Sequence, residues 1–309
     1  MVPQRTLLLG LLLGACGAPA DQGDLVGDDT DDTTPGADDP YAGLPAPKAP
    51  AAYSKGTCPE LVAGENTKFA SGKRTNREFL LRLPADPEGA GVVFMWHGNG
   101  DTMEAFDRYL DAKGAAKELD VIAVIPEAGS GGYGLDWSVP PNDPSADATF
   151  FDDLLSCLDA QYGIDRRRVY TMGFSAGALW SSWLVMHRAE HLASAVIFSG
   201  GSDGSVGIGP KVNPYAKPAW RIPVVMTEGG ADDVVAVNFT QMSRSMAGKL
   251  RDDRSVAVLC SHTQGHTPPT GWNSWAWDFL DAHVHRSLPS PYADGEDPSG
   301  TLPAGCTWE

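Results

Sequence analysis

A serine between two glycines, in Gly173-Phe-Ser-Ala-Gly177, carries the strongest chemical signal in this sequence. An apolar run at 169–172 predicts a strand before it, and residues 176–188 predict a helix after it. In a strand–turn–helix of this kind the serine occupies a sharp, strained turn, and the helix N-terminus points free N–H groups at the site. The Ser175 oxygen, held in that way, can attack a carbonyl carbon.

A second serine, Ser202, lies in the same G-x-S-x-G spacing at 200–204. This motif also follows an apolar run, but the residues after Gly204 are Ser-Val-Gly-Ile-Gly-Pro-Lys, which cannot begin a helix. The surroundings of Ser202 therefore indicate a glycine-rich loop, and Ser175 is the expected nucleophile.

A serine nucleophile needs a base and an acid that orients the base. Asp232 and Asp233 lie in the segment that directly follows an apolar run at 223–227, so either can supply the acid. The expected base is His266, which lies between a glycine and a proline-rich turn, and His262 is the alternative. The resulting order of serine, acid and histidine is that of hydrolases with a nucleophile on a strand-to-helix turn.

The oxyanion of such a reaction needs two N–H donors. We expect one from the backbone of Ala176 and one from the loop at 97–100, with Asn99 as first choice and Gly98 as second. His97 in the same loop is interpreted as structural.

Three aromatic residues on predicted loops, Tyr133, Trp137 and Trp272, are candidates for binding an aromatic or polymeric substrate, with core packing as the alternative. Trp180 and Trp183 follow the serine on a predicted helix and are expected in the core. The sequence contains no long apolar insertion, which predicts an open site without a large lid.

Apolar runs alternate with helical patterns along the chain, which predicts an α/β fold with a mostly parallel sheet covered by helices on both faces. The predicted helices include 102–119, with Asp101 as its cap, 147–162 and 273–283. The remaining apolar runs predict strands at 77–83, 91–96, 121–125, 195–198, 223–227 and 255–259.

The N-terminal 52 residues predict targeting and a tether. Arg5 and the apolar run at 7–13 are typical of a signal peptide over 1–15. Leu13-Gly-Ala-Cys16 resembles a bacterial lipobox, which implies lipidation of Cys16; an ordinary signal peptide is the alternative. Residues 16–52, rich in Asp, Pro and Gly, predict a disordered tether, and 53–309 a single catalytic domain. The expected location is the cell envelope, as a lipoprotein, or outside the cell, with membrane contact only through the lipid.

The formal net charge of −17 over 309 residues makes nucleic acid an improbable partner. Cys58, Cys157, Cys260 and Cys306 predict two disulfides in an exported chain, and we favour a Cys58–Cys306 pair that ties the ends of the domain. Because no C-x-x-C spacing exists, no metal site is expected, and nothing in the chain predicts a cofactor.

Four segments together resemble the polyhydroxybutyrate depolymerase/feruloyl esterase family, which is similar to carbohydrate esterase family 1. They are Trp96-His-Gly-Asn-Gly100, Gly173-Phe-Ser-Ala-Gly177, Gly230-Ala-Asp-Asp-Val-Val235 and Gly265-His-Thr-Pro268. The resemblance covers about 74–285 and implies an α/β-hydrolase fold with Ser175 as nucleophile, Asp232 as acid and His266 as base. The chain departs from the family pattern at Glu228, often His there, and at Pro268, often aromatic.

The resulting hypothesis is an exported serine esterase that uses an acyl-enzyme. Its substrate would be a polyhydroxyalkanoate-type polyester, or feruloyl or acetyl esters of plant polysaccharide. A serine peptidase on the same fold is one alternative, because a triad does not separate amides from esters. The other is a surface lipoprotein that only binds its ligand, although such a protein has no need for a complete triad.

Overall fold

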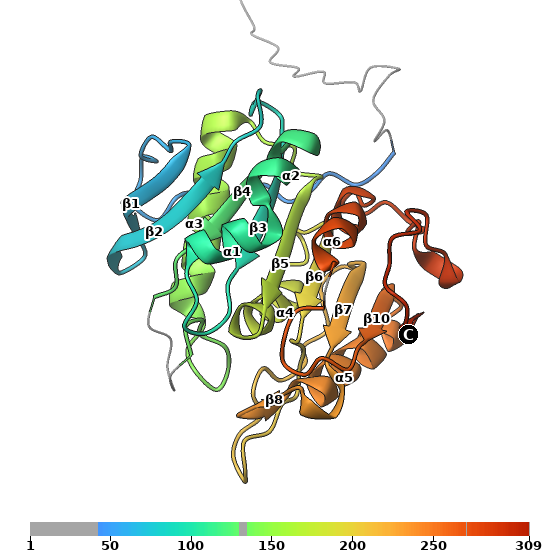
Figure 1. The fold of residues 1–309 in the computed structure, drawn as a ribbon. Coiled ribbons are helices and arrows are strands. Elements are labelled where there is room, and N and C mark those ends of the chain that lie inside the picture. Colours follow the sequence, from blue (N-terminus) through green and yellow to red (C-terminus); the bar gives the residue numbers. More distant parts are fainter. Residues whose placement is uncertain (1–42, 130–134, 270, 309) are drawn as a thin grey trace, which may run out of the picture. The chain divides into compact units, whose positions relative to one another are not determined.

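The computed structural model describes residues 43–129, 135–269 and 271–308. A nine-stranded sheet runs through this part in the order β1-β2-β4-β3-β5-β6-β7-β10-β11 (Figure 1). From β4 to β10 all neighbouring strands are parallel, and β1, β2 and β11 add antiparallel edges. The expected mostly parallel sheet is therefore confirmed. The strands are β1 (Gly64–Ser71), β2 (Arg74–Arg82), β3 (Gly91–Trp96), β4 (Val121–Pro126), β5 (Val169–Phe174), β6 (Ser194–Phe198), β7 (Val224–Glu228), β10 (Ala257–Ser261) and β11 (Cys306–Trp308).

Helices cover both faces of the sheet, and a separate apolar cluster fills each face. The helices α1 (Met103–Leu110), α2 (Ala112–Glu118) and α6 (Trp272–Asp281) bury their apolar side chains on one face. The helices α3 (Ser145–Tyr162), α4 (Ala176–His187) and α5 (Phe239–Asp252) do so on the other face. Strands β3 to β7 are buried on both faces, which explains why they read as uninterrupted apolar runs.

The helix expected over 102–119 is divided at Asp111, whose φ of 48° is left-handed. The Asp111 carboxylate accepts the Gly114 N–H and so begins α2, while Thr102 rather than Asp101 caps α1. The sequence prediction also missed β1, α5, β11 and a short hairpin of β8 (Val234–Val235) and β9 (Val237–Asn238).

The structural unit begins at Leu44 rather than at Tyr53. The Arg167 guanidinium donates to the carbonyls of Leu44 and Pro45, and Lys48 pairs with Glu190 at 3.2 Å, so these residues belong to the domain. The predicted signal peptide, Cys16 and most of the predicted tether lie outside the described residues. Within the described part, no helix is long and apolar enough to cross a membrane.

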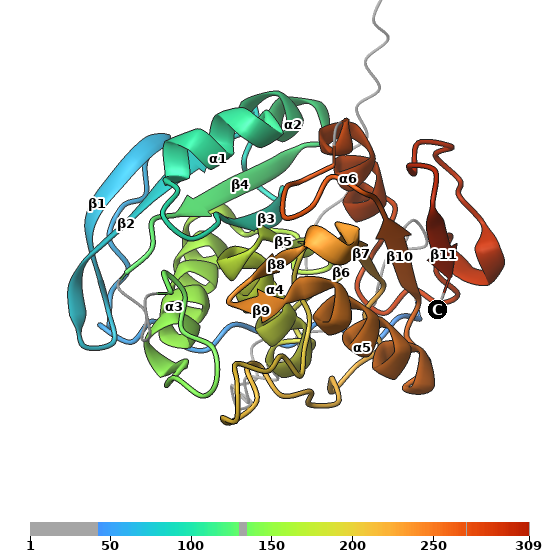
Figure 2. The same cartoon turned by 60° about the horizontal axis from the view of Figure 1, so that its bottom comes forward.

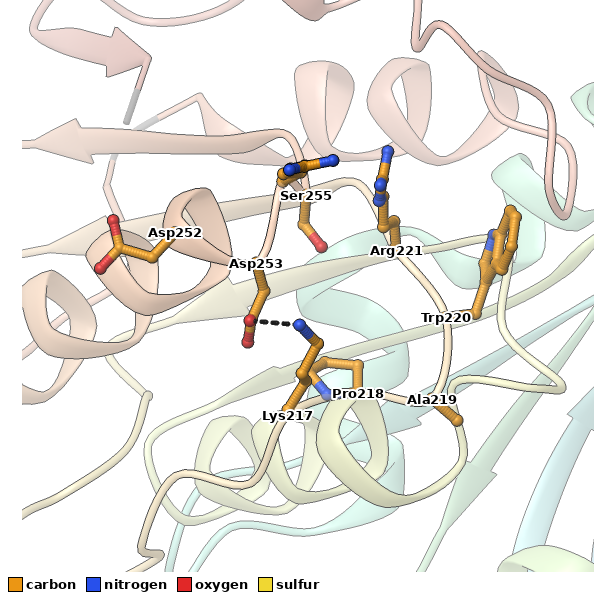
Figure 3. A pocket seen from close by; sticks show the side chains of 9 residues that line it. Lys217, Pro218, Ala219, Trp220, Arg221, Asp252, Asp253 and Ser255 are labelled. Atoms are coloured by element: carbon orange, nitrogen blue, oxygen red, sulfur yellow. Dashed lines mark ion pairs between the residues drawn. The ribbon is translucent and has the colours of Figure 1, made fainter.

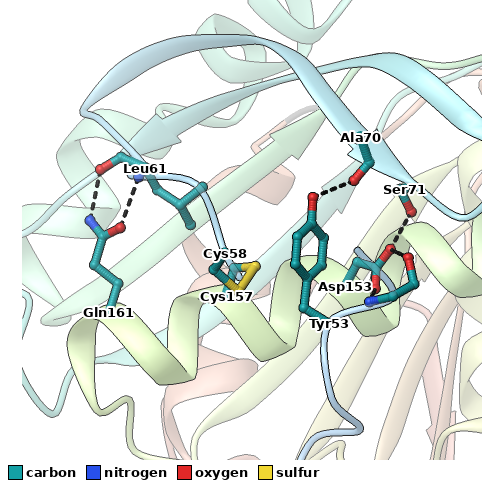
Figure 4. Close-up of a disulfide and its surroundings, with 9 residues drawn as sticks. Tyr53, Cys58, Leu61, Ala70, Ser71, Asp153, Cys157 and Gln161 are labelled. Atoms are coloured by element: carbon teal, nitrogen blue, oxygen red, sulfur yellow. Dashed lines mark hydrogen bonds between the residues drawn. A yellow bond between two sulfur atoms is a disulfide. The ribbon is translucent and has the colours of Figure 1, made fainter. Parts of the chain in front are cut away.

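The disulfides join Cys58 to Cys157 and Cys260 to Cys306, so the favoured Cys58–Cys306 pair is wrong. The error followed from the missed strand β11, since Cys260 and Cys306 are direct partners in the antiparallel β10–β11 pair. Cys157 lies on α3, where the chain near Cys58 crosses that helix (Figure 4).

Polar contacts hold the segment around Cys58 on both sides of its disulfide (Figure 4). The Asp153 carboxylate on α3 accepts the backbone N–H and the hydroxyl of Ser54, and also the Ser71 hydroxyl from β1. Further along α3, the Gln161 side chain exchanges two hydrogen bonds of 2.8 Å with the Leu61 backbone. This segment therefore fastens β1 to α3.

Removing the first disulfide is expected to destabilise the domain strongly. The sequence separation of Cys58 and Cys157 is 99 residues, and closing a loop of that length lowers unfolded-state entropy by an equivalent of about 4–5 kcal/mol. The Cys58→Ala/Cys157→Ala variant should therefore lose on the order of 3–5 kcal/mol in the free energy of unfolding by urea, measured at pH 7. An unchanged free energy would mean that the bridge contributes nothing.

His283, which follows α6, is expected to make stability depend on pH. Its ring is buried, with Nδ1 on the Phe279 carbonyl and Nε2 on the Ser290 hydroxyl. Burial lowers the pKa of His283 to about 4. The unfolded state thus binds a proton below about pH 6.5 that the folded state resists, so stability is lost as pH falls from about 6.5 towards 4.

The expected contribution of His283 is up to about 3 kcal/mol between pH 7 and pH 4. Urea unfolding of the wild type and of His283→Gln at several pH values measures it. The variant should lose less stability on acidification than the wild type. Parallel pH curves for the two proteins would contradict the role given to this ring.

Candidate active site

The turn between β5 and α4 holds Ser175 in a strained backbone conformation. Its φ of 55° and ψ of −117° lie outside the usual regions for a residue with a side chain. A Cβ at Gly173 would lie 2.3 Å from the Gly177 carbonyl oxygen, and one at Gly177 would lie 2.0 Å from that of Trp96. Both glycines are therefore needed for the close packing of β3, β5 and α4 behind the serine.

His266 lies directly against Ser175, on the loop between β10 and α6. Its Nε2 is 2.8 Å from the Ser175 Oγ. The imidazole stacks between Phe174 and Phe239, with ring centroids 5.1 and 4.4 Å away. These two rings fix the plane of the imidazole. The sequence prediction had not identified Phe239, because it had missed the helix that Phe239 begins.

The acid that contacts His266 is Asp233, and the choice of Asp232 is wrong. The Asp233 Oδ1 lies 2.6 Å from the His266 Nδ1, and its side chain is fully buried. Its Oδ2 accepts the Ser199 hydroxyl at 3.0 Å and the Gly229 N–H at 2.9 Å. Asp232 ends the short 3₁₀ turn η2 (Gly230–Asp232), and its side chain is exposed. The turn directs the first carboxylate outwards and the second inwards.

This arrangement fixes the proton positions on His266. A carboxylate only accepts, so Nδ1 carries the proton that is donated to Asp233. The Nε2 lone pair then faces the Ser175 hydroxyl, ready to take its proton. The loop carrying Asp233 and the β8–β9 hairpin lie over the end of the sheet where β5, β6 and β7 finish (Figure 2).

Glu228, one of the two residues that depart from the family pattern, anchors the loop that carries Asp233. Its buried carboxylate accepts the Gly230 N–H, the hydroxyls of Thr240 and Ser261, and an Arg244 N–H at 2.6 Å. Burial works to raise the pKa of Glu228, but these hydrogen bonds outweigh it and lower the pKa. Glu228 thus ties the ends of β7 and β10 to the start of α5.

The loop after β3 lies beside the nucleophile, as expected of an oxyanion loop. A Cβ at Gly98 would come within 3.5 Å of the Ser175 Cβ, and Ala176 is the first residue of α4. The Asn99 amide oxygen accepts the Asp136 N–H at 2.9 Å, and the Asp136 carboxylate accepts the N–H of Gly100 at 2.6 Å. These contacts fasten the loop near Ser175.

His97 supports the same loop from below. Its ring is fully buried, with Nδ1 2.8 Å from the Gly98 carbonyl oxygen and Nε2 3.4 Å from the Glu127 carboxylate. Burial works to lower the pKa of His97, but Glu127 and the Gly98 carbonyl outweigh it, so the pKa is raised. The structural interpretation of His97 fits these contacts.

Two of the three predicted aromatic binding residues, Trp137 and Trp272, are buried. Trp137 is fully buried and donates its indole N–H to the His97 carbonyl, and Trp272 is buried against Phe198 and Tyr109. Both are packing residues, Trp137 on a loop and Trp272 as the first residue of α6. Tyr133 lies outside the described residues.

His262, the alternative base, is not brought to Ser175. Its Nδ1 accepts the Gln264 N–H at 3.2 Å, and its backbone N–H donates to the Glu228 carbonyl. Among the residues that the structure describes, no three His, Cys, Asp or Glu side chains gather as a metal site.

A polar hollow of about 560 Å³ lies away from the triad, at the edge where β7 and β10 begin (Figure 3). Its charged lining includes Lys217 paired with Asp253 at 2.7 Å, together with Arg221 and Arg254. Because Ser175 lies at the opposite ends of the strands, this hollow cannot hold a group that reacts there.

Comparison with known proteins agrees with the fold. No protein-family model matches the chain. Oxidized polyvinyl alcohol hydrolase of Pseudomonas sp is 27% identical over 198 residues, which cover 52% of each chain. The protein of the same name from Sphingopyxis sp. is 26% identical and covers 81% of this chain and 87% of its own. Feruloyl esterase D of Neurospora crassa is 26% identical, over 73% of this chain and 75% of its own.

Among solved structures, native pOPH superposes with a TM-score of 0.63 at 21% identity, covering 85% of this chain and 96% of that one. The chain thus has the α/β-hydrolase fold expected from the resemblance. Its curated relatives carry the names of esterases and hydrolases. The chain spans about half the length of the Pseudomonas relative and most of the other two.

Proposed function

We propose that this protein is a serine hydrolase of carboxylic esters. The observation that carries the proposal is the continuous chain from Ser175 Oγ through the His266 ring to the buried Asp233 carboxylate, with distances of 2.8 and 2.6 Å. A serine on a strained turn with an oriented base and acid is the arrangement that acyl transfer requires.

In the first half of the reaction, Ser175 Oγ bonds to the ester carbonyl carbon while His266 Nε2 takes the hydroxyl proton. The carbonyl oxygen becomes an oxyanion, and the Ala176 N–H and the N–H of Asn99 or Gly98 stabilise it. When the tetrahedral intermediate collapses, the C–O bond to the alcohol breaks and His266 returns the proton to the leaving oxygen. The acyl group remains on Ser175.

In the second half, water replaces the alcohol. His266 takes a proton from water, the hydroxide oxygen bonds to the acyl carbon, and the bond to Ser175 Oγ breaks as the serine regains its proton. Asp233 keeps a proton on the His266 Nδ1 and stabilises the imidazolium in both halves of the reaction. The products are a carboxylic acid and an alcohol.

The proposed substrates are polymeric or bulky esters, of the polyhydroxyalkanoate type or feruloyl and acetyl esters of plant polysaccharide. The name feruloyl esterase D of one relative supports this class. Export and lipidation of Cys16 are part of the proposal, and the two disulfides support a location outside the cytoplasm.

A second candidate substrate follows from the two relatives named oxidized polyvinyl alcohol hydrolase. Oxidising the alcohols of polyvinyl alcohol leaves ketones on an all-carbon chain. Where two ketones flank one carbon, Ser175 could attack one carbonyl, and the carbon–carbon bond would break with an enolate as the leaving group. His266 would protonate that enolate, and water would then release the acyl group from Ser175 as in ester hydrolysis. The same triad would therefore serve.

A panel of substrates tests the proposal with the full chain. p-Nitrophenyl acetate, methyl ferulate, a hydroxybutyrate oligomer, a 1,3-diketone and a p-nitroanilide peptide would be compared, with and without prior treatment by a fluorophosphonate. We expect hydrolysis of at least one ester, complete loss after fluorophosphonate treatment, and slower anilide cleavage. Cleavage of the diketone alone would favour the second candidate. A folded protein inert on every compound would contradict catalysis and favour ligand binding.

A further inference from the structure

An apolar pocket of about 390 Å³ is lined in part by residues of the two segments that carry Ser175 and Asp233. Its size is within the range of small-molecule sites in proteins. Among the described residues that line it, Asn142 has the only side chain that is not apolar, and none is charged. This composition contrasts with the charged hollow near Lys217 at the other edge of the sheet.

Two walls of the pocket, on α4 and over residues 235–239, come from segments that also build the catalytic site. Leu179 lies one helical turn after Ser175 on α4, with its N–H bonded to the Ser175 carbonyl. Residues 235–237 of the β8–β9 hairpin lie two to four residues after Asp233, and Phe239 stacks on the His266 ring at 4.4 Å. Phe239 therefore contacts both the pocket and the catalytic base.

A third wall, formed by residues 206–212, is joined by hydrogen bonds to α4 and to the fourth wall, the loop at 139–142. The buried Asn213 side chain donates to the carbonyls of Leu179 and Gly201, and its backbone N–H donates to the Pro140 carbonyl. These bonds join the wall to α4 and to the loop that contributes Pro140. The pocket is thus built into the fold before any substrate arrives.

Apolar side chains continue from the floor to the rim. Leu179, Val212 and Phe239 are buried, whereas Val206 and Val235 on the rim are 52% and 55% exposed. Their sequence neighbours Ile208 and Val234 are exposed as well. Single exposed apolar residues are ordinary, but a group at the mouth of an apolar pocket marks a binding surface.

We propose that this pocket binds an aliphatic chain of the substrate, next to the carbonyl carbon that Ser175 attacks. Valine, leucine and proline side chains gain by burying methylene groups, and they offer no partner to a carboxylate, a sugar hydroxyl or a phenol. This inference rests on the proposed function and narrows it: the preferred substrate has an aliphatic segment beside its reacting carbonyl.

The test measures how kcat/KM depends on chain length. One series varies the acyl group of p-nitrophenyl esters from acetate to hexanoate, and a second varies the alcohol of alkyl acetates. Each buried methylene should raise kcat/KM by up to about fourfold. A rise in one series is expected, and that series identifies the side of the ester that enters the pocket.

Two rim variants and one matched control connect the rise to this pocket. Val206→Asp and Val235→Asp place a charge at the mouth, and each should lower the ratio of long-chain to short-chain kcat/KM by at least about fivefold. Val62→Asp makes the same change at an exposed valine outside the pocket and should retain the wild-type ratio. Hydrolysis of the short esters with no rise in either series, or with a rise that both rim variants retain, would overturn the inference.

A binding measurement separates this inference from the proposed chemistry. 1-Hexanol titrated into the Ser175→Ala variant, followed by ligand-observed NMR, should bind and should bind more weakly when Val235→Asp is added. Absence of binding overturns the inference. If hexanol binds while the wild type hydrolyses no ester, the pocket stands and the proposed function fails.

Discussion

Ser175→Ala is expected to lower kcat by at least about 10⁴-fold, to the level of the protein's residual catalysis. The variant keeps His266, Asp233 and the oxyanion donors but has no oxygen to form the acyl-enzyme. Because the Ser175 side chain makes one hydrogen bond, to His266, the fold should be unaffected. Initial rates on the best ester of the panel, with circular dichroism as the check of folding, measure the effect.

The second G-x-S-x-G serine supplies the matched control. Ser202 is buried, and its hydroxyl donates to Asp203 rather than to a histidine. Ser202→Ala should therefore keep kcat within about threefold of the wild type, since losing one neutral hydrogen-bond donor weakens folding only modestly. Equal losses in the two variants would mean that a serine-free mechanism or general misfolding explains the data.

Asp233→Asn and Asp232→Asn are expected to differ by about three orders of magnitude in kcat. Asparagine at 233 can donate to His266 Nδ1, which favours the wrong tautomer and leaves the imidazolium without its anionic partner. A loss of about 10³–10⁴-fold should follow. Asp232 is exposed and does not contact the ring, so Asp232→Asn should stay within about threefold of the wild type.

The same initial-rate assay at pH 8 checks this pair, and each protein serves as control for the other. The adjacent position and identical chemistry of the two substitutions remove general effects of charge. A large loss in Asp232→Asn with little loss in Asp233→Asn would restore the acid that the family resemblance implies. It would also require the loop after β7 to turn the other way.

The nucleophile and base could be predicted from the sequence because local signals surround them. Ser175 follows an apolar run and begins a helix, and His266 lies on the loop after the last parallel strand. The sequence could not decide which of the two aspartates is the acid. Two adjacent carboxylates follow β7. Asp232 is the last residue of the 3₁₀ turn and Asp233 is the first residue after it, and this difference of one position makes Asp233 face inwards. Ser199, which donates a hydrogen bond to that acid, could have been predicted as a polar residue directly after β6.

Exposure of loop aromatics was beyond prediction. Trp137 lies on a loop and Trp272 is the first residue of α6, and the burial of each depends on what packs against it. The apolar pocket could not be predicted for the same reason, because its walls come from four segments that are separated in the sequence. The missed β11 shows a related limit, since three residues near the C-terminus gain their pairing only from β10.

Trapping the acyl-enzyme tests the central claim most directly. The wild type would be mixed with a p-nitrophenyl ester, quenched in acid within milliseconds to seconds, digested and examined by mass spectrometry. We predict a burst of nitrophenol and an acyl adduct on the peptide that contains Ser175, with no adduct in Ser175→Ala. An active enzyme that shows a burst with its adduct on any other residue would contradict the account.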